Sequence, residues 1–266
     1  MDEFASFNQA KWDELAERGI LYSRPLLDLT PETAREWLDP SGRLGDVTGL
    51  RVLCLAGGGG KQSAAFGVLG AEVDVLDLSP AMLERNKAAA AKYGFSAGAQ
   101  QGDMRDLSAY PDRAFDLVWQ PYALNYVPDP LPVFTEVARV LKPGGRYVLQ
   151  VANPFFIGLF ETDWDGNGYP VSLPYVNGAE ILGQVWEFED GEGRSQRMPG
   201  PRTFRHTLSG VINPLVDLGF NLLAVLEEPS QDFDAPPGSW DHFTNTVVPW
   251  FTLWFAFPAV ETSGEA

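Results

Sequence analysis

Cysteine is almost absent from this chain: one residue, Cys54, stands among 266. A single thiol cannot form an internal disulfide, so the sequence favours a reducing, cytoplasmic setting. Leu53 and Leu55 flank Cys54, which predicts a buried structural thiol rather than a reactive one.

Long apolar segments are also missing. The longest run, VVPWFTLWFAFPAV at 247–260, contains two prolines and is shorter than a membrane span. It predicts a buried strand. The beginning of the chain, MDEFASFNQAKWDEL, has no apolar core of the kind that signal peptides carry. We therefore expect no membrane partner.

Basic residues are scarce, with 19 Lys and Arg against 36 Asp and Glu, a formal net charge of −17. Nucleic acids and anionic membranes bind through cationic patches, so neither is expected as a partner. The remaining composition, 45% hydrophobic, is ordinary for a globular protein, and the length suits one large domain.

Strand-like and helix-like segments alternate through the middle of the chain, which predicts a parallel sheet covered by helices. The predicted strands are 51–55, 72–77, 98–101, 115–119 and 146–151, and the predicted helices are 61–69, 80–93 and 130–141. Regularity then stops over 153–205, a stretch rich in Gly, Pro, aromatic and acidic residues. A helix at 207–218 and strands at 221–228 and 250–257 are predicted to close the fold.

The segment 153–205 has two interpretations. It is either a surface decoration or a cap over a pocket, because long loops in compact domains are usually functional. Its aromatic side chains favour the cap. We expect it to close over a small molecule at the edge of the sheet.

Four consecutive glycines, 57–60, lie between the first predicted strand and the first predicted helix. Such a turn lets a ligand lie against bare backbone N–H groups. Asp77 closes the second strand, where its carboxylate could bind the vicinal hydroxyls of a ribose. Dinucleotides, S-adenosylmethionine and simple phosphates all use this geometry.

The spacing of the glycines and their neighbours disfavours dinucleotides and simple phosphates as ligands. The dinucleotide pattern G-x-G-x-x-G fails in both registers, since Gln62 or Ser63 stands at its third glycine. The phosphate-loop pattern fails because Gln62, not Ser or Thr, follows Lys61. An oxidoreductase would often carry Tyr-x-x-x-Lys, but Tyr126 stands four residues after Tyr122.

Several segments in order resemble class I S-adenosylmethionine-dependent methyltransferases, more narrowly the bacterial small-molecule enzymes of the ubiquinone/menaquinone-biosynthesis type. They are VLCLAGGGGKQ, VLDLSP, QGDMRDL, FDLVWQPYALNYV and LKPGGRYVL. The family often has an acidic residue where Cys54 stands and a glycine where Ala56 stands.

The resemblance implies a Rossmann-like, seven-stranded, mostly parallel sheet with helices on both faces, an antiparallel last strand and an irregular cap after the fifth strand. As one methyltransferase domain, it would comprise an N-terminal helical segment (1–48), a cofactor-binding core (49–152), the cap (153–205) and a closing helix and strands (206–258). The cofactor would be S-adenosylmethionine.

The resemblance also implies roles for individual residues. Along the methionine moiety it places Ala56, Gly57, Gly58 and Gly60, with Gln120 at the methionine end. Asp77 would bind the ribose, Leu78 and Met82 would flank the adenine, Asp103 would accept from its amino group, and Met104 would lie against its ring. A helix preceding the core often covers the cofactor in this family, which makes Trp12 and Tyr22 binding candidates.

Methyl transfer from a sulfonium is an in-line displacement that depends on alignment and exclusion of water, so no universal catalytic residue is expected. A base is needed only when the acceptor must lose a proton. His206 and His242 are the two candidates. Tyr122 and Asn125 follow the fourth strand and are candidates for contacting a small-molecule acceptor, as is His206.

No metal is expected, and the protein could be a monomer or a homodimer. A non-catalytic cofactor-binding protein and a dinucleotide-dependent oxidoreductase on the same fold remain the alternatives. The identity of the acceptor does not follow from the sequence.

Overall fold

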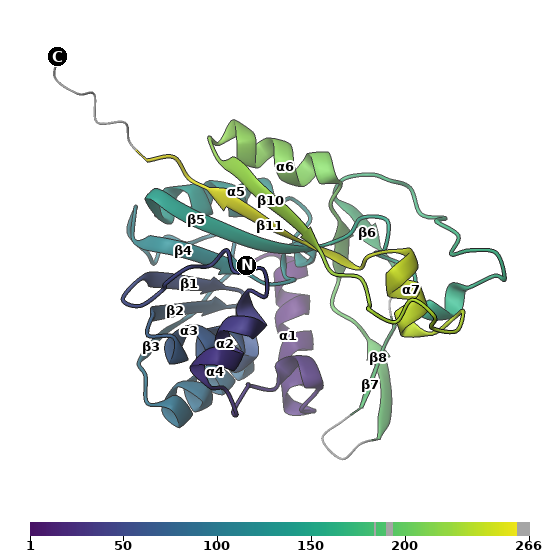
Figure 1. Ribbon diagram of the computed structural model, residues 1–266, viewed down its shortest axis with the longest axis horizontal. Helices are drawn as coiled ribbons and strands as arrows, with labels where there is room; N and C mark the ends of the chain where they lie inside the picture. The colour runs from purple at the N-terminus through teal and green to yellow at the C-terminus, as the bar shows by residue number, and fades with distance from the viewer. Residues whose placement is uncertain (184, 190–193, 260–266) are drawn as a thin grey trace.

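A computed structural model of the chain describes residues 1–183, 185–189 and 194–259. Its centre is a seven-stranded sheet in the order β10-β11-β5-β4-β1-β2-β3 (Figure 1). Neighbouring strands from β5 to β3 are parallel, whereas β11 runs antiparallel to both β5 and β10. This arrangement confirms the predicted fold class.

The strands lie close to their predicted positions, and β5 begins earlier than expected. They are β1 (Arg51–Leu55), β2 (Glu72–Asp77), β3 (Ala97–Gln101), β4 (Phe115–Gln120), β5 (Leu141–Ala152), β10 (Asn221–Glu227) and β11 (Trp250–Ala256). The apolar run near the end of the chain is therefore a buried strand, as predicted. No helix in the described part of the chain is long and apolar enough to cross a membrane.

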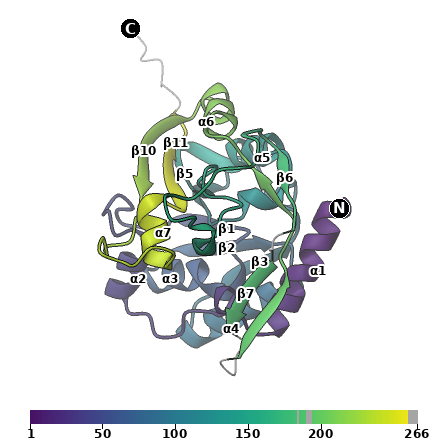
Figure 2. The same cartoon turned by 90° about the vertical axis from the view of Figure 1, so that its right-hand side faces the viewer.

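Helices cover both faces of the sheet (Figures 1 and 2). On one face, α5 (Leu131–Val140) and α6 (Leu208–Asp217) pack against Leu53 and Leu55 of β1. On the other, α2 (Pro31–Leu38), α3 (Gln62–Val68) and α4 (Pro80–Tyr93) pack against Val52 and Cys54. Because both faces of β1 are buried, its sequence is a continuous apolar run. Cys54 is fully buried, and that burial raises the pKa of its thiol, which confirms the structural role.

Local signals in the sequence set the ends of α4. The side chain of Ser79 accepts from the Met82 N–H at 3.1 Å, and Pro80 occupies the first turn. Gly94 ends the helix in the left-handed conformation, with φ of 72°.

A second lobe lies beyond the carboxyl ends of the strands (Figure 1). The segment 153–205 is more regular than predicted. It contains the short helical turn η4 (Glu161–Asp163) and two antiparallel pairs, β6 (Ala179–Ile181) with β9 (Thr203–Arg205) and β7 (Val185–Glu189) with β8 (Ser195–Pro199). Short strands interrupted by Gly and Pro left no clear period in the sequence.

Residues 228–249 also contribute to this lobe, which the sequence did not indicate. Their helix α7 (Trp240–Thr246) brings Phe243 into stacking contact with Phe156, with ring centroids 4.7 Å apart. Tyr169 and Trp164 belong to the same cluster. We use "cap lobe" for the described residues of 153–205 together with 228–249. Several aromatic side chains that favoured a cap over a pocket thus form a small core of the lobe itself.

Candidate functional site

The glycine-rich turn follows β1 and includes the 3-10 turn η2 (Gly58–Gly60). A Cβ on Gly58 would lie 2.5 Å from Asp77 Oδ2 and 2.9 Å from the Met82 Cβ. Since real Cβ atoms do not approach so closely, glycine is required there by the protein's own side chains. Ala56 has φ of 51°, a left-handed conformation that explains why glycine is common at this position.

The far side of the turn is equally tight. Gly59 and Gly60 have φ of 83° and 76°. A Cβ on Gly59 would lie 3.0 Å from the Ser23 carbonyl oxygen, and one on Gly60 would lie 2.9 Å from the Ala89 Cβ of α4. The turn is therefore enclosed between the segment that precedes α2 and helix α4.

Asp77 ends β2 directly beside this turn. Its Oδ1 accepts from the Ser79 N–H at 2.9 Å, and the Gly58 N–H also donates to the carboxylate. The residue is only 8% exposed, and burial raises the pKa of its carboxyl to about 6, while the backbone donors oppose that rise. The negative charge of Asp13 contributes a smaller rise. Leu78, next in the chain, is half-buried, and Met82 is buried over the turn.

Asp103 and Met104 follow β3 and lie in the loop after it. Both oxygens of Asp103 accept from Arg105: Nη2 lies 2.6 Å from Oδ2, and Nε lies 3.0 Å from Oδ1. No pattern in the sequence predicted this pairing of Asp103 with Arg105. Gln120 ends β4 fully buried, and its amide nitrogen lies 3.3 Å from the Met104 sulfur. The hydroxyl of Tyr147 donates to its Oε1. The structure thus brings Met104 and Gln120 together.

Trp12 and Tyr22 both reach the cap lobe through Trp186. Trp12 lies in α1 (Glu3–Glu17) and Tyr22 in η1 (Leu21–Ser23). Their ring centroids are 5.8 and 6.2 Å from that of Trp186. The two candidates therefore stand where α1, the glycine-rich turn and the cap lobe meet.

The candidates after β4 divide into two kinds. Tyr122 is half-exposed, with its ring 5.1 Å from that of Trp250. Asn125 is buried: its amide donates to the Phe204 carbonyl at 2.9 Å and accepts from the Ala152 N–H at 3.2 Å. His206 is 1% exposed, and its Nε2 donates to the Leu124 carbonyl at 3.1 Å. Asn125 and His206 thus hold the loop after β4, whereas Tyr122 is open to contact.

The second histidine has a different setting. His242 is half-buried in the cap lobe, and its Nδ1 lies 2.9 Å from the Tyr169 hydroxyl. Burial lowers the pKa of His206, so His206 stays neutral near pH 7. The sequence offered no basis for choosing between the two.

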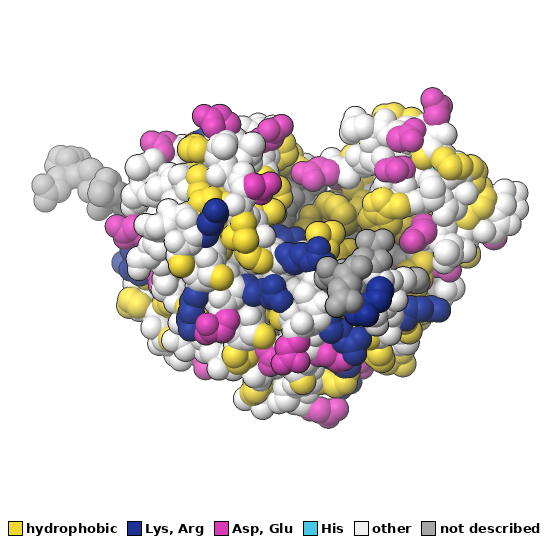
Figure 3. All heavy atoms as spheres, turned by 90° about the horizontal axis from the view of Figure 1, so that it is seen from below, with side chains coloured by type: hydrophobic (Ala, Val, Ile, Leu, Met, Phe, Trp, Pro, Cys, Tyr) yellow, Lys and Arg dark blue, Asp and Glu magenta, His cyan; other side chains and the backbone are white. Residues whose placement is uncertain are grey.

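A hollow separates the core from the cap lobe (Figure 3). Hydrophobic side chains form part of its wall, and Lys and Arg side chains gather at its lip, although the whole chain is strongly acidic. Lys61 comes directly after the glycine-rich turn and is half-buried. Within the described residues it makes no hydrogen bond or ion pair. Burial and the charge of Arg24 lower its pKa.

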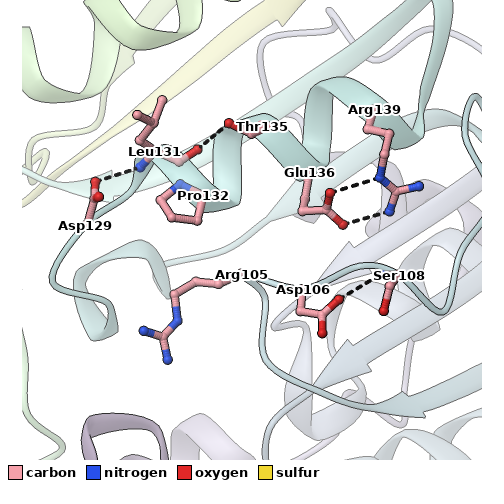
Figure 4. A pocket seen from close by; sticks show the side chains of 9 residues that line it. All are labelled: Arg105, Asp106, Ser108, Asp129, Leu131, Pro132, Thr135, Glu136 and Arg139. Carbon is pink, nitrogen blue, oxygen red and sulfur yellow. Dashed lines mark hydrogen bonds and ion pairs between the residues drawn. The ribbon is translucent and has the colours of Figure 1, made fainter. Parts of the chain in front are cut away.

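A separate depression lies between the loop after β3 and helix α5 (Figure 4). Arg105, Glu136 and Arg139 in its lining are already in ion pairs, such as that of Glu136 and Arg139 at 2.7 Å. It does not include the glycine-rich turn, Asp77 or Gln120. We therefore do not assign the reaction to it.

Comparisons with known proteins fit this arrangement. The family described as "Methyltransferase domain" matches residues 53–149, the stretch from β1 to β5 that carries the turn, Asp77, Asp103 and Gln120. The chain therefore contains a methyltransferase domain, and the comparisons support a class I S-adenosylmethionine-dependent enzyme.

Individual relatives extend the match beyond the core. The chain is 28% identical to the "Uncharacterized methyltransferase YbaJ" of Bacillus subtilis over 86% of this chain and 92% of that protein. It is 32% identical to a ubiquinone biosynthesis O-methyltransferase of Xanthomonas oryzae, over 58% of this chain and 60% of the relative. The match therefore spans less than two thirds of that relative.

Solved structures support the fold. A crystal structure of a putative S-adenosylmethionine-dependent methyltransferase from Listeria monocytogenes superposes with a TM-score of 0.64. The alignment has 24% sequence identity and covers 85% of this chain and 99% of that one. At this identity the likeness concerns the methyltransferase fold alone.

We predict opposite effects of Asp77→Asn on stability and on binding. The carboxyl has a folded pKa of about 6, above its unfolded value near 4, so its ionised form disfavours folding. That cost is absent below about pH 4 and complete above about pH 6. Asp77→Asn should raise the free energy of unfolding by roughly 1–3 kcal/mol at pH 7 and leave it nearly unchanged at pH 4. Urea denaturation at both pH values measures this, with the exposed Asp234→Asn as control.

The same variant should weaken binding of S-adenosylhomocysteine, because ribose hydroxyls donate better to a carboxylate than to an amide. In the wild type, affinity should fall as the pH is lowered through about 6, since protonation removes the acceptor. Titration calorimetry from pH 5 to 8 tests both effects. A pH-independent affinity, or full affinity in Asp77→Asn, would refute the assignment of Asp77.

We predict that Gly60→Ala destabilises the protein more than Gly94→Ala. Both glycines have left-handed φ values near 75°, but a Cβ at Gly94 meets nothing within 4 Å, whereas one at Gly60 meets α4. Gly94→Ala should cost about 1–2 kcal/mol for the conformation alone. Gly60→Ala should cost roughly 1–3 kcal/mol more, from overpacking. Equal losses in urea denaturation would show that the contact with α4 is not a constraint.

Proposed function

We propose that this methyltransferase transfers the methyl group of S-adenosylmethionine to a small-molecule acceptor held between the core and the cap lobe. The observation that carries the proposal is the pairing of bare backbone at Gly58 with the buried carboxylate of Asp77. A side chain at Gly58 would fill the space beside that carboxylate. This cradle fits a nucleoside whose ribose hydroxyls donate to Asp77, and S-adenosylmethionine supplies the electrophilic methyl group when bound.

The adenine end would lie at Asp103, Met104 and Leu78. Asp103 Oδ1 already accepts from the Arg105 backbone N–H and from its Nε, at 2.9 and 3.0 Å. Oδ2 accepts from Arg105 Nη2 at 2.6 Å and from Nε at 3.2 Å, and the adenine amino group would be a further donor to this carboxylate. The glycine-rich turn, from Ala56 to Gly60, would follow the methionine moiety.

The chemistry of the chain would be alignment and exclusion of water. Gln120 is held by Met104 and Tyr147, so the floor of the site beneath the methyl group would be fixed before binding. The cap lobe would cover the acceptor, because the open edge of the sheet cannot exclude water alone. Where an acceptor must lose a proton, His206 would act through Nδ1, because its Nε2 donates to a carbonyl, and His242 would act through Nε2, because its Nδ1 contacts the Tyr169 hydroxyl.

Lys61 would bind the carboxylate of the methionine moiety. It follows the turn directly, and the segment 23–25 packs on Gly59 and Gly60, which brings the charge of Arg24 close to it. The positive charges of Lys61 and Arg24 repel each other, and a bound anion would relieve that repulsion. The amino acid end of the cofactor provides one.

We expect the protein to bind S-adenosylmethionine and S-adenosylhomocysteine, and to transfer a labelled methyl group from the former to a member of a panel of phenols, amines, thiols and carboxylic acids. Calorimetry with NADH should give no binding. Binding of NADH in place of both sulfur nucleosides would refute the proposal and favour an oxidoreductase. Binding with no transfer to any acceptor class would favour a non-catalytic role.

We expect Lys61→Met to weaken binding of S-adenosylhomocysteine roughly tenfold, as loss of one charge-assisted bond does. Binding of 5′-methylthioadenosine, which lacks the carboxylate, should not change. Lys87→Met, at an exposed ion pair on α4, is the matched control and should alter neither. An equal loss for both nucleosides would show that Lys61 acts on the shape of the turn and not on the carboxylate.

A further inference from the structure

Helix α1 lies between the cofactor-binding core and the cap lobe, alongside α4 and near the β7–β8 pair (Figures 1 and 2). It has polar links to both sides. Two links on the core side lead to a carboxylate that the proposed function assigns to the cofactor. Two others do not: Arg85 donates to the Ala16 carbonyl, and the Asn8 amide donates to the Tyr126 carbonyl at 3.3 Å.

The first link starts at the beginning of α1. Asp2 caps the helix by accepting from the Ala5 N–H at 2.9 Å. Its other oxygen lies 2.6 Å from Arg105 Nη1, while Arg105 holds Asp103 through Nη2 and Nε. The side chain of Arg105 is 21% exposed. One guanidinium thus fixes the Asp103 carboxylate and the first turn of α1 together.

The second link lies near the end of α1. Asp13 Oδ1 accepts from the Ser79 hydroxyl at 2.5 Å and from the Ala81 N–H at 3.2 Å, at the first turn of α4. The Ser79 N–H in turn donates to Asp77. Asp13 is therefore part of the cap of α4, supplied by a helix far away in the chain.

The opposite side of α1 is bonded to the strand that ends the first part of the cap lobe. Asn8 is buried, and its side chain accepts from the Arg202 N–H at 2.7 Å and donates to the Arg202 carbonyl at 3.0 Å. Glu3 pairs with Arg202 Nη1 at 2.9 Å, and the Phe4 ring lies edge-on to Phe204 of β9. The cap lobe is thus attached to the same rigid helix.

We propose that Asp13 and Arg105 are positioning residues for the cofactor and that α1 couples cofactor binding to the placement of the cap lobe, an inference that rests on the proposed function. A ligand that donates to Asp77 and Asp103 holds these carboxylates in one orientation. In the same orientation the two carboxylates accept from Ser79 and Arg105, and these two residues in turn bind α1. Through Asn8 and Glu3, α1 then restrains β9, so the cap lobe opens less often when the nucleoside is bound. Coupling of this kind is reciprocal, so placement of the cap lobe also favours retention of the cofactor.

The test is backbone hydrogen exchange of β6 and β9 with and without saturating S-adenosylhomocysteine. In the wild type the ligand should slow exchange of these amides several-fold. Arg105→Ala and Asp2→Asn should reduce or abolish this slowing even when both are saturated with ligand. Arg105→Ala should also weaken ligand binding roughly tenfold, with partial rescue by Arg105→Lys.

Asn8→Ala separates the two halves of the proposal, since Asn8 contacts no residue assigned to the cofactor. It should bind the ligand nearly as well as wild type, yet β9 should no longer respond. Should that variant not fold, Glu3→Gln, which removes only the exposed pair with Arg202, should reduce the response. Arg51→Ala, at the opposite end of β1 from the turn, breaks an ion pair with Asp74 and should change neither quantity.

The outcomes are distinguishable. If the wild type does not bind S-adenosylhomocysteine, the proposed function fails and the coupling fails with it. If the ligand binds but exchange of β9 does not respond, or responds equally in Arg105→Ala and Asp2→Asn, the coupling is refuted while the proposed function stands.

Discussion

The burial of one carboxylate against a bare stretch of backbone is the constraint on which this structure depends. Asp77 is held between the Gly58 and Ser79 N–H groups, in a space that no side chain at Gly58 could share. Burying a charge without a cation disfavours folding. This cost falls at the end of β2, where the charge would bind a ribose in the proposed function. The glycines beside it serve the protein's own packing as much as any ligand.

The elements around Asp77 are arranged by contacts with it and with its neighbours. Helix α4 must begin immediately after Asp77, and Ser79 caps it. Asp13 from α1 completes this cap, and Arg105 ties the beginning of α1 to Asp103. The result is a series of polar contacts that joins the proposed nucleoside site to α1. Such contacts specify orientation more than they add stability, as expected where a ligand has to enter and leave.

Charge is distributed unevenly over the molecule. The chain carries a net charge of −17, yet Lys and Arg side chains gather at the lip of the hollow between the lobes (Figure 3). A net charge describes the long-range field of the whole surface and not the potential in one site. The acidic balance alone would favour a cationic acceptor, whereas the basic lip favours an anionic group at that place. In the proposed function the carboxylate of the cofactor would be that anionic group, and the charge of the acceptor would stay open.

The methyltransferase fold and the order of its motifs could be read from the sequence, because they depend on local signals. Alternation of strands and helices, the cap at Ser79, the stop at Gly94 and the glycines after β1 are all short-range features. The burial of Cys54 followed from its two leucine neighbours in the same way. The domain boundaries and the roles of individual site residues remain predictions.

Only the tertiary structure decided which distant residues meet. Asp13 lies 66 residues from Ser79, and Asp2 lies 103 residues from Arg105, so no periodicity links them. The same holds for α7, which joins the cap lobe from the other side of β10, and for His206, whose imidazole is engaged by a carbonyl of the loop after β4. A sequence fixes local conformation through steric and capping preferences that act within a few residues, whereas long-range polar contacts form only after the whole chain has packed.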